Sequence, residues 1–96
     1  MAIESAGWHM DDGPASWRPE AKAFSFYLRK LGHNRVLCVV SIDALEGAVQ
    51  SNGLSETALS RIFDAHRLMI ELRAAQKLNA GLFESDGSVF VRANDI

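Results

Sequence analysis

The side chains that most often carry catalysis or bind metals are few in this sequence. The three histidines, His9, His33 and His66, are far apart, and no two have the spacing that places two imidazoles on one metal ion. Cys38 is the only cysteine, and its apolar surroundings predict a buried thiol with a raised pKa and little reactivity. A Cys38–His66 dyad would require a helix to cross that strand. The sequence therefore indicates no catalytic residue, no cofactor-binding residue and no metal ligand, and it favours a protein that is not an enzyme.

The most suggestive polar group consists of His66, Arg67 and Glu71. Arg67 and Glu71 are four residues apart, so on a helix they can pair on one face, and His66 falls in the apolar stripe between Phe63 and Ile70. One interpretation is a polar site at the interface of sheet and helix. The other is a structural ion pair beside a hydrogen-bonded histidine at the edge of the core, and this second arrangement is the one that we expect.

A second candidate site is the basic segment 18–35. It carries five Lys or Arg residues against one acid, and Arg29, Lys30 and Arg35 are expected at a hairpin tip, where they could bind an anion. Nucleic-acid-binding proteins usually carry more positive charge together with stacking aromatic residues, and here only Tyr27 is close. Solvated surface charge is the alternative interpretation.

Strands are predicted before the helices. Apolar residues alternate over 24–29, and residues 36–42 are β-branched and almost wholly apolar. With a Gly/Asn turn between them, they predict an antiparallel hairpin whose second strand is covered on both faces. A last strand is expected at 89–92, with or without a partner strand at 82–83.

Two helices are predicted between the hairpin and the last strand. Ser41 and Ser55 are expected to cap them, and the second helix keeps one apolar stripe for about six turns, until Gly81. The order strand, strand, helix, helix, strand predicts an α+β fold: an antiparallel β-hairpin, two helices and a C-terminal strand or hairpin, in a small sheet with the helices packed on one face.

Residues 1–22 are expected to form an irregular N-terminal arm, with a short strand near residues 2–10, before a single α+β domain at residues 23–96. Trp8 and Trp17 lie on this arm in a polar setting, and such tryptophans usually pack on their own domain or on another copy of the chain. A small sheet also leaves edges that dimers often bury. We therefore predict a homo-oligomer that forms through the arm or a sheet edge, with both tryptophans as candidate interface residues.

The composition fits one compact domain. The 96 residues are 48% hydrophobic with a net charge of −2, and a chain of this length buries only about 60–65% of its unfolded surface. The longest apolar run, 36–40, is much shorter than the roughly 20 residues that span a membrane. The first residues do not resemble a signal peptide, and one cysteine needs no oxidising compartment. The expected location is the cytoplasm, without a membrane partner.

Several short motifs follow one another in order along residues 17–92. They are Phe24-Ser25-Phe26, Gly32 before Val36, Cys38-Val39-Val40-Ser41 leading into Ala44-Leu45-Glu46, Phe63 before His66-Arg67, Ile70-Glu71 before Ala74-Ala75, and Gly87-Ser88-Val89. This ordered set resembles the domain-of-unknown-function family 1488 of small bacterial proteins, although His66 stands where the family pattern has Asn. The resemblance implies a small α+β fold and no assigned activity.

Three classes of function are therefore compared. The sequence favours a non-enzymatic protein-interaction module that self-associates. The alternative is a regulator that binds nucleic acid through the basic hairpin residues Arg29, Lys30 and Arg35, and the third class is an enzyme that uses Cys38 or His66. An exposed apolar patch would mark the first class, a clustered basic face the second, and a concave pocket around a perturbed side chain the third.

Overall fold

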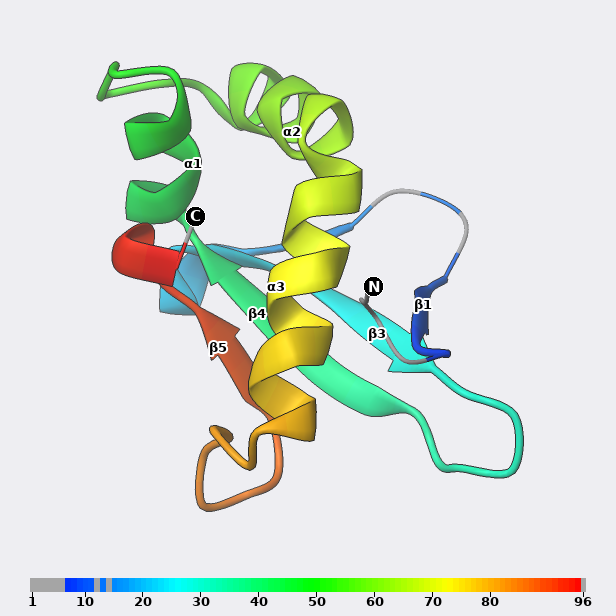
Figure 1. The fold of residues 1–96 in the computed structure, drawn as a ribbon. Coiled ribbons are helices and arrows are strands. Elements are labelled where there is room, and N and C mark those ends of the chain that lie inside the picture. Colours follow the sequence, from blue (N-terminus) through cyan, green and yellow to red (C-terminus); the bar gives the residue numbers. More distant parts are fainter. Residues whose placement is uncertain (1–6, 12, 14, 96) are drawn as a thin grey trace.

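The computed structural model of the chain describes residues 7–11, 13 and 15–95, and its elements are those of an α+β fold (Figure 1). A mixed five-stranded sheet lies behind three helices, with two short 3₁₀ helices at its margins. The elements in chain order are β1 (His9–Met10), β2 (Ser16–Arg18), η1 (Pro19–Ala21), β3 (Ala23–Arg29), β4 (Val36–Ser41), α1 (Ile42–Ala48), α2 (Glu56–Ala65), α3 (Arg67–Asn79), β5 (Val89–Val91) and η2 (Ala93–Asp95). Within the described residues, no helix is long and apolar enough to cross a membrane.

The hairpin of β3 and β4 is confirmed. Its register pairs Phe24 with Val40 and Phe26 with Cys38, so these four side chains point to one face of the sheet. All four are buried. The sequence alternation therefore places the core correctly on this pair of strands.

The rest of the sheet is built on the two outer edges of this hairpin. β1 and β2 pair side by side with β3 in antiparallel orientation, so the described part of the arm adds two short strands to the sheet. β5 pairs with β4 in parallel orientation, and residues 82–83 form no strand, so the predicted C-terminal strand is a single strand and not part of a hairpin. A parallel partner for β4 follows because α3 carries the chain back across the sheet before β5 begins.

The free edge of β5 is occupied by a side chain. Lys77 donates to the carbonyl oxygen of Phe90 at 2.7 Å and to the carboxylate of Asp95 at 2.9 Å. Burial alone would raise the pKa of Asp95, but hydrogen bonds from the Arg92 N–H and from Lys77 outweigh it and lower that pKa. A lysine at an edge strand hinders strand addition by another chain.

The helical prediction needs one correction, because the second predicted helix is two helices. α2 ends at Ala65, and α3 begins at Arg67 in a new direction (Figure 1). His66 leaves the helical conformation, with φ −109° and ψ 18°, and its N–H donates to the carbonyls of Ile62 and Phe63. The turn lets the apolar residues of both helices face the core. Both predicted caps are confirmed, since the hydroxyls of Ser41 and Ser55 accept from backbone N–H groups three residues later.

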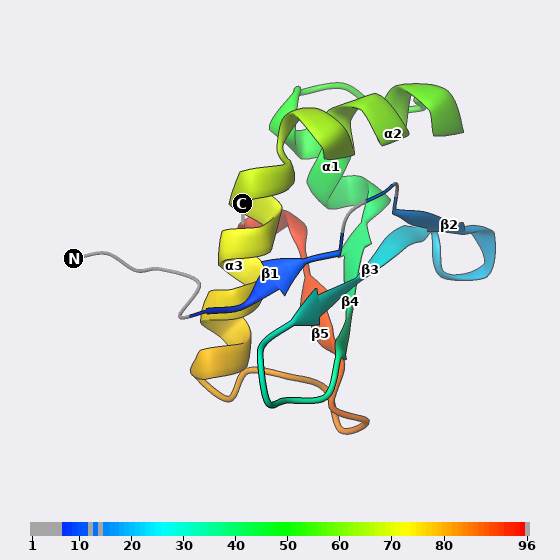
Figure 2. The ribbon, with the colours of Figure 1, turned by 90° about the vertical axis from the view of Figure 1, so that its right-hand side faces the viewer.

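The helices lie on one face of the sheet, as predicted, and none of the helices in the described part of the chain covers the opposite face (Figure 2). The prediction that β4 is covered on both faces is therefore wrong. Cys38 and Val40 are fully buried on the helical face, whereas Leu37 and Val39 on the other face are only half-buried. An apolar strand face without a covering layer is the structural feature on which the candidate site is built.

Candidate functional site

The open face of the sheet, opposite the helices, carries a small apolar centre with arginines around it. Because side chains alternate along each strand, Tyr27 of β3, Leu37 and Val39 of β4, and Phe90 of β5 point to this face, and all four are half-buried. The register places Ser25, Val39 and Phe90 in one row across three strands. The arginines around this apolar centre are Arg18, Arg29, Arg35 and Arg92.

Two of these arginines lie over aromatic rings of the same face. The guanidinium carbon of Arg35 is 4.1 Å from the centre of the Tyr27 ring, and that of Arg92 is 4.4 Å from the centre of the Phe90 ring. At these distances the cation is attracted by the negative face of the ring. Each stack therefore holds an exposed arginine over a half-buried aromatic residue.

The other two arginines are tied to polar groups. Arg18 donates from Nε to the hydroxyl of Ser25 at 2.9 Å, and this contact buries Ser25. Arg29 pairs with Asp11, with 3.0 Å between Nε and Oδ1. All four arginines of the open face are consequently held in defined positions.

Shallow hollows lie beside both aromatic rings. One, of about 200 Å³, is lined by Asp11, Ser16, Arg18, Ser25 and Tyr27 among others. The other, of about 440 Å³, is lined by Ser41, Asp43, Phe90, Arg92, Ala93 and Asn94. Each hollow thus combines an aromatic ring, an arginine, one carboxylate and neutral hydrogen-bonding groups.

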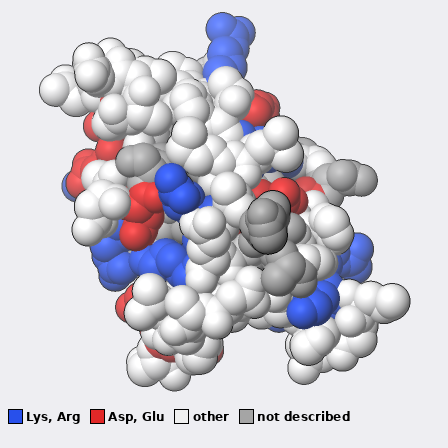
Figure 3. Space-filling view, viewed as in Figure 1, with Lys and Arg blue, Asp and Glu red and all other residues white. Residues whose placement is uncertain are grey.

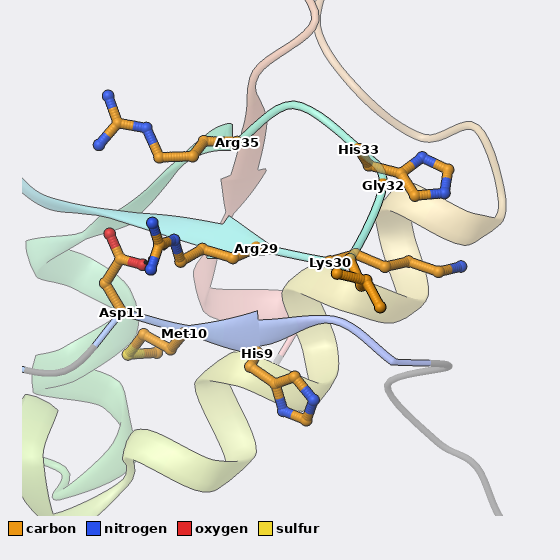
Figure 4. Close-up of a pocket in the computed structure, with 9 residues that line it drawn as sticks. His9, Met10, Asp11, Arg29, Lys30, Gly32, His33 and Arg35 are labelled. Carbon is orange, nitrogen blue, oxygen red and sulfur yellow. Dashed lines mark ion pairs between the residues drawn. The ribbon is translucent and has the colours of Figure 1, made fainter.

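The predicted anion-binding tip lies beside a larger depression of about 610 Å³, but its cations do not converge there (Figure 4). Arg35 and Lys30 point in opposite directions, and Arg29 turns towards Asp11. The ammonium nitrogen of Lys30 lies 5.7 Å from the centre of the Trp8 ring. A single anion in this depression would therefore not contact all three cations. Two of the three, Arg29 and Arg35, also belong to the open face.

Of the predicted polar group His66, Arg67 and Glu71, the last two contact the arm. Glu71 accepts the N–H of Met10 at 2.6 Å. Arg67 donates to the carbonyl of Gly13 and reaches the sulfur of Met10 at 3.3 Å. The predicted ion pair between Arg67 and Glu71 is not formed, because the arm supplies a better partner to each. These contacts form a clamp that holds β1 on α3.

This clamp predicts faster hydrogen exchange in the arm when Glu71 is removed. Glu71→Ala leaves the N–H of Met10 without its charged acceptor, a loss of about 1–3 kcal/mol, so its exchange should be faster by about 5- to 150-fold. Glu46→Ala is the matched control, because Glu46 makes the same kind of bond to the N–H of Leu54 at 3.2 Å. Equal exchange at Met10 in both variants would show that Glu71 does not hold the arm.

Both tryptophans pack on their own domain. Trp8 is buried, with its ring centre 5.6 Å from that of His33, and Trp17 is half-buried against Phe24 at 5.0 Å. Most of their apolar area is therefore used within the chain.

Cys38 is buried, and His66 makes a structural contact within α2. Burial raises the pKa of Cys38 to about 12, and its sulfur donates to the carbonyl of Val36 at 3.6 Å. The ring Nδ1 of His66 lies 3.0 Å from the carbonyl of Ile62, so it caps α2. Within residues 7–11, 13 and 15–95, no three His, Cys, Asp or Glu side chains gather in a way that could hold a metal ion.

The comparisons with known proteins identify the family. The family model described as "Protein of unknown function (DUF1488)" matches residues 11–91. The chain belongs to the DUF1488 family. This confirms the resemblance seen in the order of the sequence motifs.

A solved structure of the DUF1488 family has the same fold. It is the crystal structure of a protein of unknown function from Shewanella loihica PV-4, with a TM-score of 0.79 and 18% sequence identity, and the match covers 88% of this chain and 91% of that one. At this identity the likeness shows the fold alone. No curated protein matches the sequence.

Sequence reasoning missed half of the open face of this DUF1488 chain. It found Arg29, Arg35 and Tyr27 in the hairpin but not Arg18, Phe90 or Arg92. The signal was available in part, because alternation in Val89–Val91 points Phe90 away from the core. What the sequence lacks is the information that Arg18, more than 70 residues before Phe90 and Arg92, reaches the same face through β2.

Proposed function

We propose that this protein is a non-enzymatic binding module and that the open face of its sheet binds an anionic partner. The observation that carries the proposal is the set of four arginines fixed on that face, two of them stacked on Tyr27 and Phe90. Guanidinium groups bind phosphate and carboxylate through planar pairs of hydrogen bonds. The proposal keeps the bacterial cytoplasm as the location, since the single cysteine is a free, buried thiol.

The charge on this face is positive although the whole chain carries −2. Asp11 and Glu84 pair with Arg29 and Arg92 at 3.0 and 3.7 Å, and Asp43 lines the hollow beside Arg92, so four arginines face three carboxylates. Among the described residues, no carboxylate lies within 4 Å of the charged groups of Arg18 or Arg35. By contrast, basic and acidic side chains are interspersed on the helical side (Figure 3). A local positive surface attracts anions whatever the net charge of the chain.

The test is binding of inorganic polyphosphate, a polyanion without bases, by calorimetry at low ionic strength. Arg18→Glu combined with Arg35→Glu should weaken binding by about tenfold or more. The matched control is Arg61→Glu combined with Arg73→Glu, which makes the same change in net charge on α2 and α3. An equal loss in both double variants would mean that only net charge matters, and it would refute the open face as the binding surface.

Self-association is a second candidate, and exposed apolar side chains on α3 favour it. Leu68 and Met69 are 80% and 42% exposed. They lie in the first turn of α3, next to Arg67, which contacts the arm. We propose that a second copy packs here, beside the arm, because large exposed apolar side chains commonly mark such interfaces.

Sedimentation at micromolar concentration tests this second candidate. The wild-type chain should exceed its monomer mass of 10.5 kDa, and Leu68→Glu should weaken the association by about tenfold or more. Leu31→Glu is the control, because Leu31 is 99% exposed at the hairpin tip, away from α3. A wild-type chain that remains a monomer contradicts the proposal.

A further inference from the structure

We propose that the anionic partner of the open face is a single-stranded nucleic acid, held with one base in each of the two hollows beside Tyr27 and Phe90. This inference rests on the proposed function, since it assumes that the open face is a binding surface. It adds the chemical class of the ligand and assigns a role to the aromatic residues.

The first hollow offers a flat surface and a polar edge. The Tyr27 ring lines this hollow, and the guanidinium carbon of Arg35, which is outside the lining, lies 4.1 Å from the centre of that ring. Aromatic rings and guanidinium planes are the two surfaces on which proteins stack unpaired bases. Arg18, Ser16 and Ser25 line the same hollow. Their donors and acceptors lie where the edge of a stacked base would be bound.

The second hollow repeats this combination on the same face, beside β5 at the other edge of the sheet. Phe90 and Arg92 form the stacked pair, and Ser41, Asp43 and Asn94 supply hydroxyl, carboxylate and amide groups. An amide or a carboxylate can bind the donor and acceptor pattern of a base edge. A partner that was recognised only by its negative charge would not need an aspartate in this position.

The spacing of the two hollows fits two bases of one strand. Phe90 lies in the row of Ser25 and Val39, and Tyr27 lies two residues further along β3. Two strand spacings of about 4.8 Å and two residues of about 3.3 Å each place the Cα atoms of Tyr27 and Phe90 about 12 Å apart. The half-buried side chains of Leu37 and Val39 lie between them and provide an apolar floor for the strand.

Other occupants fit this surface less well. A second copy of the chain, placed face to face, would bring arginines against arginines. A duplex keeps its bases stacked inside, so half-buried rings on a sheet could not reach their faces. An acidic peptide would pair its carboxylates with the arginines, but it would have no flat group to stack on the Tyr27 and Phe90 rings.

The test measures binding of labelled oligothymidine and oligouridine, and of an abasic sugar-phosphate strand of the same length, by fluorescence anisotropy. We expect both base-containing strands to bind at least about tenfold more tightly than the abasic strand. The ratio between thymidine and uridine strands shows whether DNA or RNA is preferred. Tyr27→Leu and Phe90→Leu should each weaken binding of the base-containing strands by about tenfold, and each should weaken polyphosphate binding by much less, so that the ratio of the two affinities falls.

A second variant keeps the test valid if these half-buried substitutions disturb the sheet. Arg35→Gln removes one stacking plane from the surface and should weaken oligothymidine binding by more than polyphosphate binding, and Arg61→Gln on α2 is its control. Equal affinity for the abasic and base-containing strands would overturn the inference and leave the proposed function intact. Tighter binding of polyglutamate than of either oligonucleotide would also overturn it, whereas a chain that binds no polyanion at all would refute both proposals.

Discussion

Phe63→Ala should lower the free energy of unfolding by about 3–5 kcal/mol, more than any other single substitution that we predict. Phe63 is almost fully buried at the end of α2, where its ring packs against Phe24 and Phe26 of β3 at centre-to-centre distances of 6.3 and 5.6 Å. Removing the ring leaves a cavity between helix and sheet and also removes two aromatic contacts. For a domain of this size, the Tm should fall by at least about 12 °C.

Phe83→Ala is the matched control for this substitution. Phe83 is 49% exposed in the loop after α3, so the same truncation should change the free energy of unfolding by about 0.5 kcal/mol or less. If Phe63→Ala does not fold at all, Phe63→Leu preserves most of the volume and should cost less than about 1.5 kcal/mol. Similar losses for Phe63→Ala and Phe83→Ala in thermal unfolding would show that Phe63 does not anchor α2.

The hairpin and the helix caps could be predicted because their signals are local. Alternation over 24–29 determines which face of β3 is buried, and Ser41 and Ser55 cap helices through bonds to residues only three positions away. The break at His66 could not be predicted in this way. No Gly or Pro marks it, and the apolar stripe runs through it, since Phe63 and Ile70 both remain buried on either side of the turn.

The candidate site was only partly predictable, because it depends on which face of the sheet the helices leave free. An almost wholly apolar strand such as β4 is typical of a strand buried on both faces, and nothing within that segment shows that no described helix covers Leu37 and Val39. The arginines of the open face also come from elements that are distant in sequence. The polar group at Arg67 and Glu71 was found correctly as a cluster, but its partner, the arm, is more than 50 residues away.

Cys38 should react with a thiol reagent about a thousandfold more slowly in the native chain than an ordinary cysteine does. Burial raises its pKa to about 12 from 9.0, so at neutral pH it holds about a thousandth of the usual thiolate, which is the reactive form. The labelling rate of the native chain, compared with that of the unfolded chain in denaturant, measures this effect. Rapid labelling of the native chain would contradict a structural role.

The same pKa predicts how stability changes in alkali. The folded chain keeps the Cys38 proton at pH values where the unfolded chain releases it, so the stabilisation by the neutral thiol is complete below about pH 9 and is lost as the pH rises towards about 12. Wild-type stability should therefore fall in this range by up to about 1.4 kcal/mol per pH unit relative to Cys38→Ala. Near neutral pH, Cys38→Ala should itself cost about 1 kcal/mol through lost packing. The measurement is denaturant unfolding of the wild type and of Cys38→Ala across this pH range. Lysine and tyrosine side chains titrate in both chains, so the difference between the two stability profiles isolates the contribution of the thiol. Parallel profiles would show that Cys38 ionises normally in the folded chain.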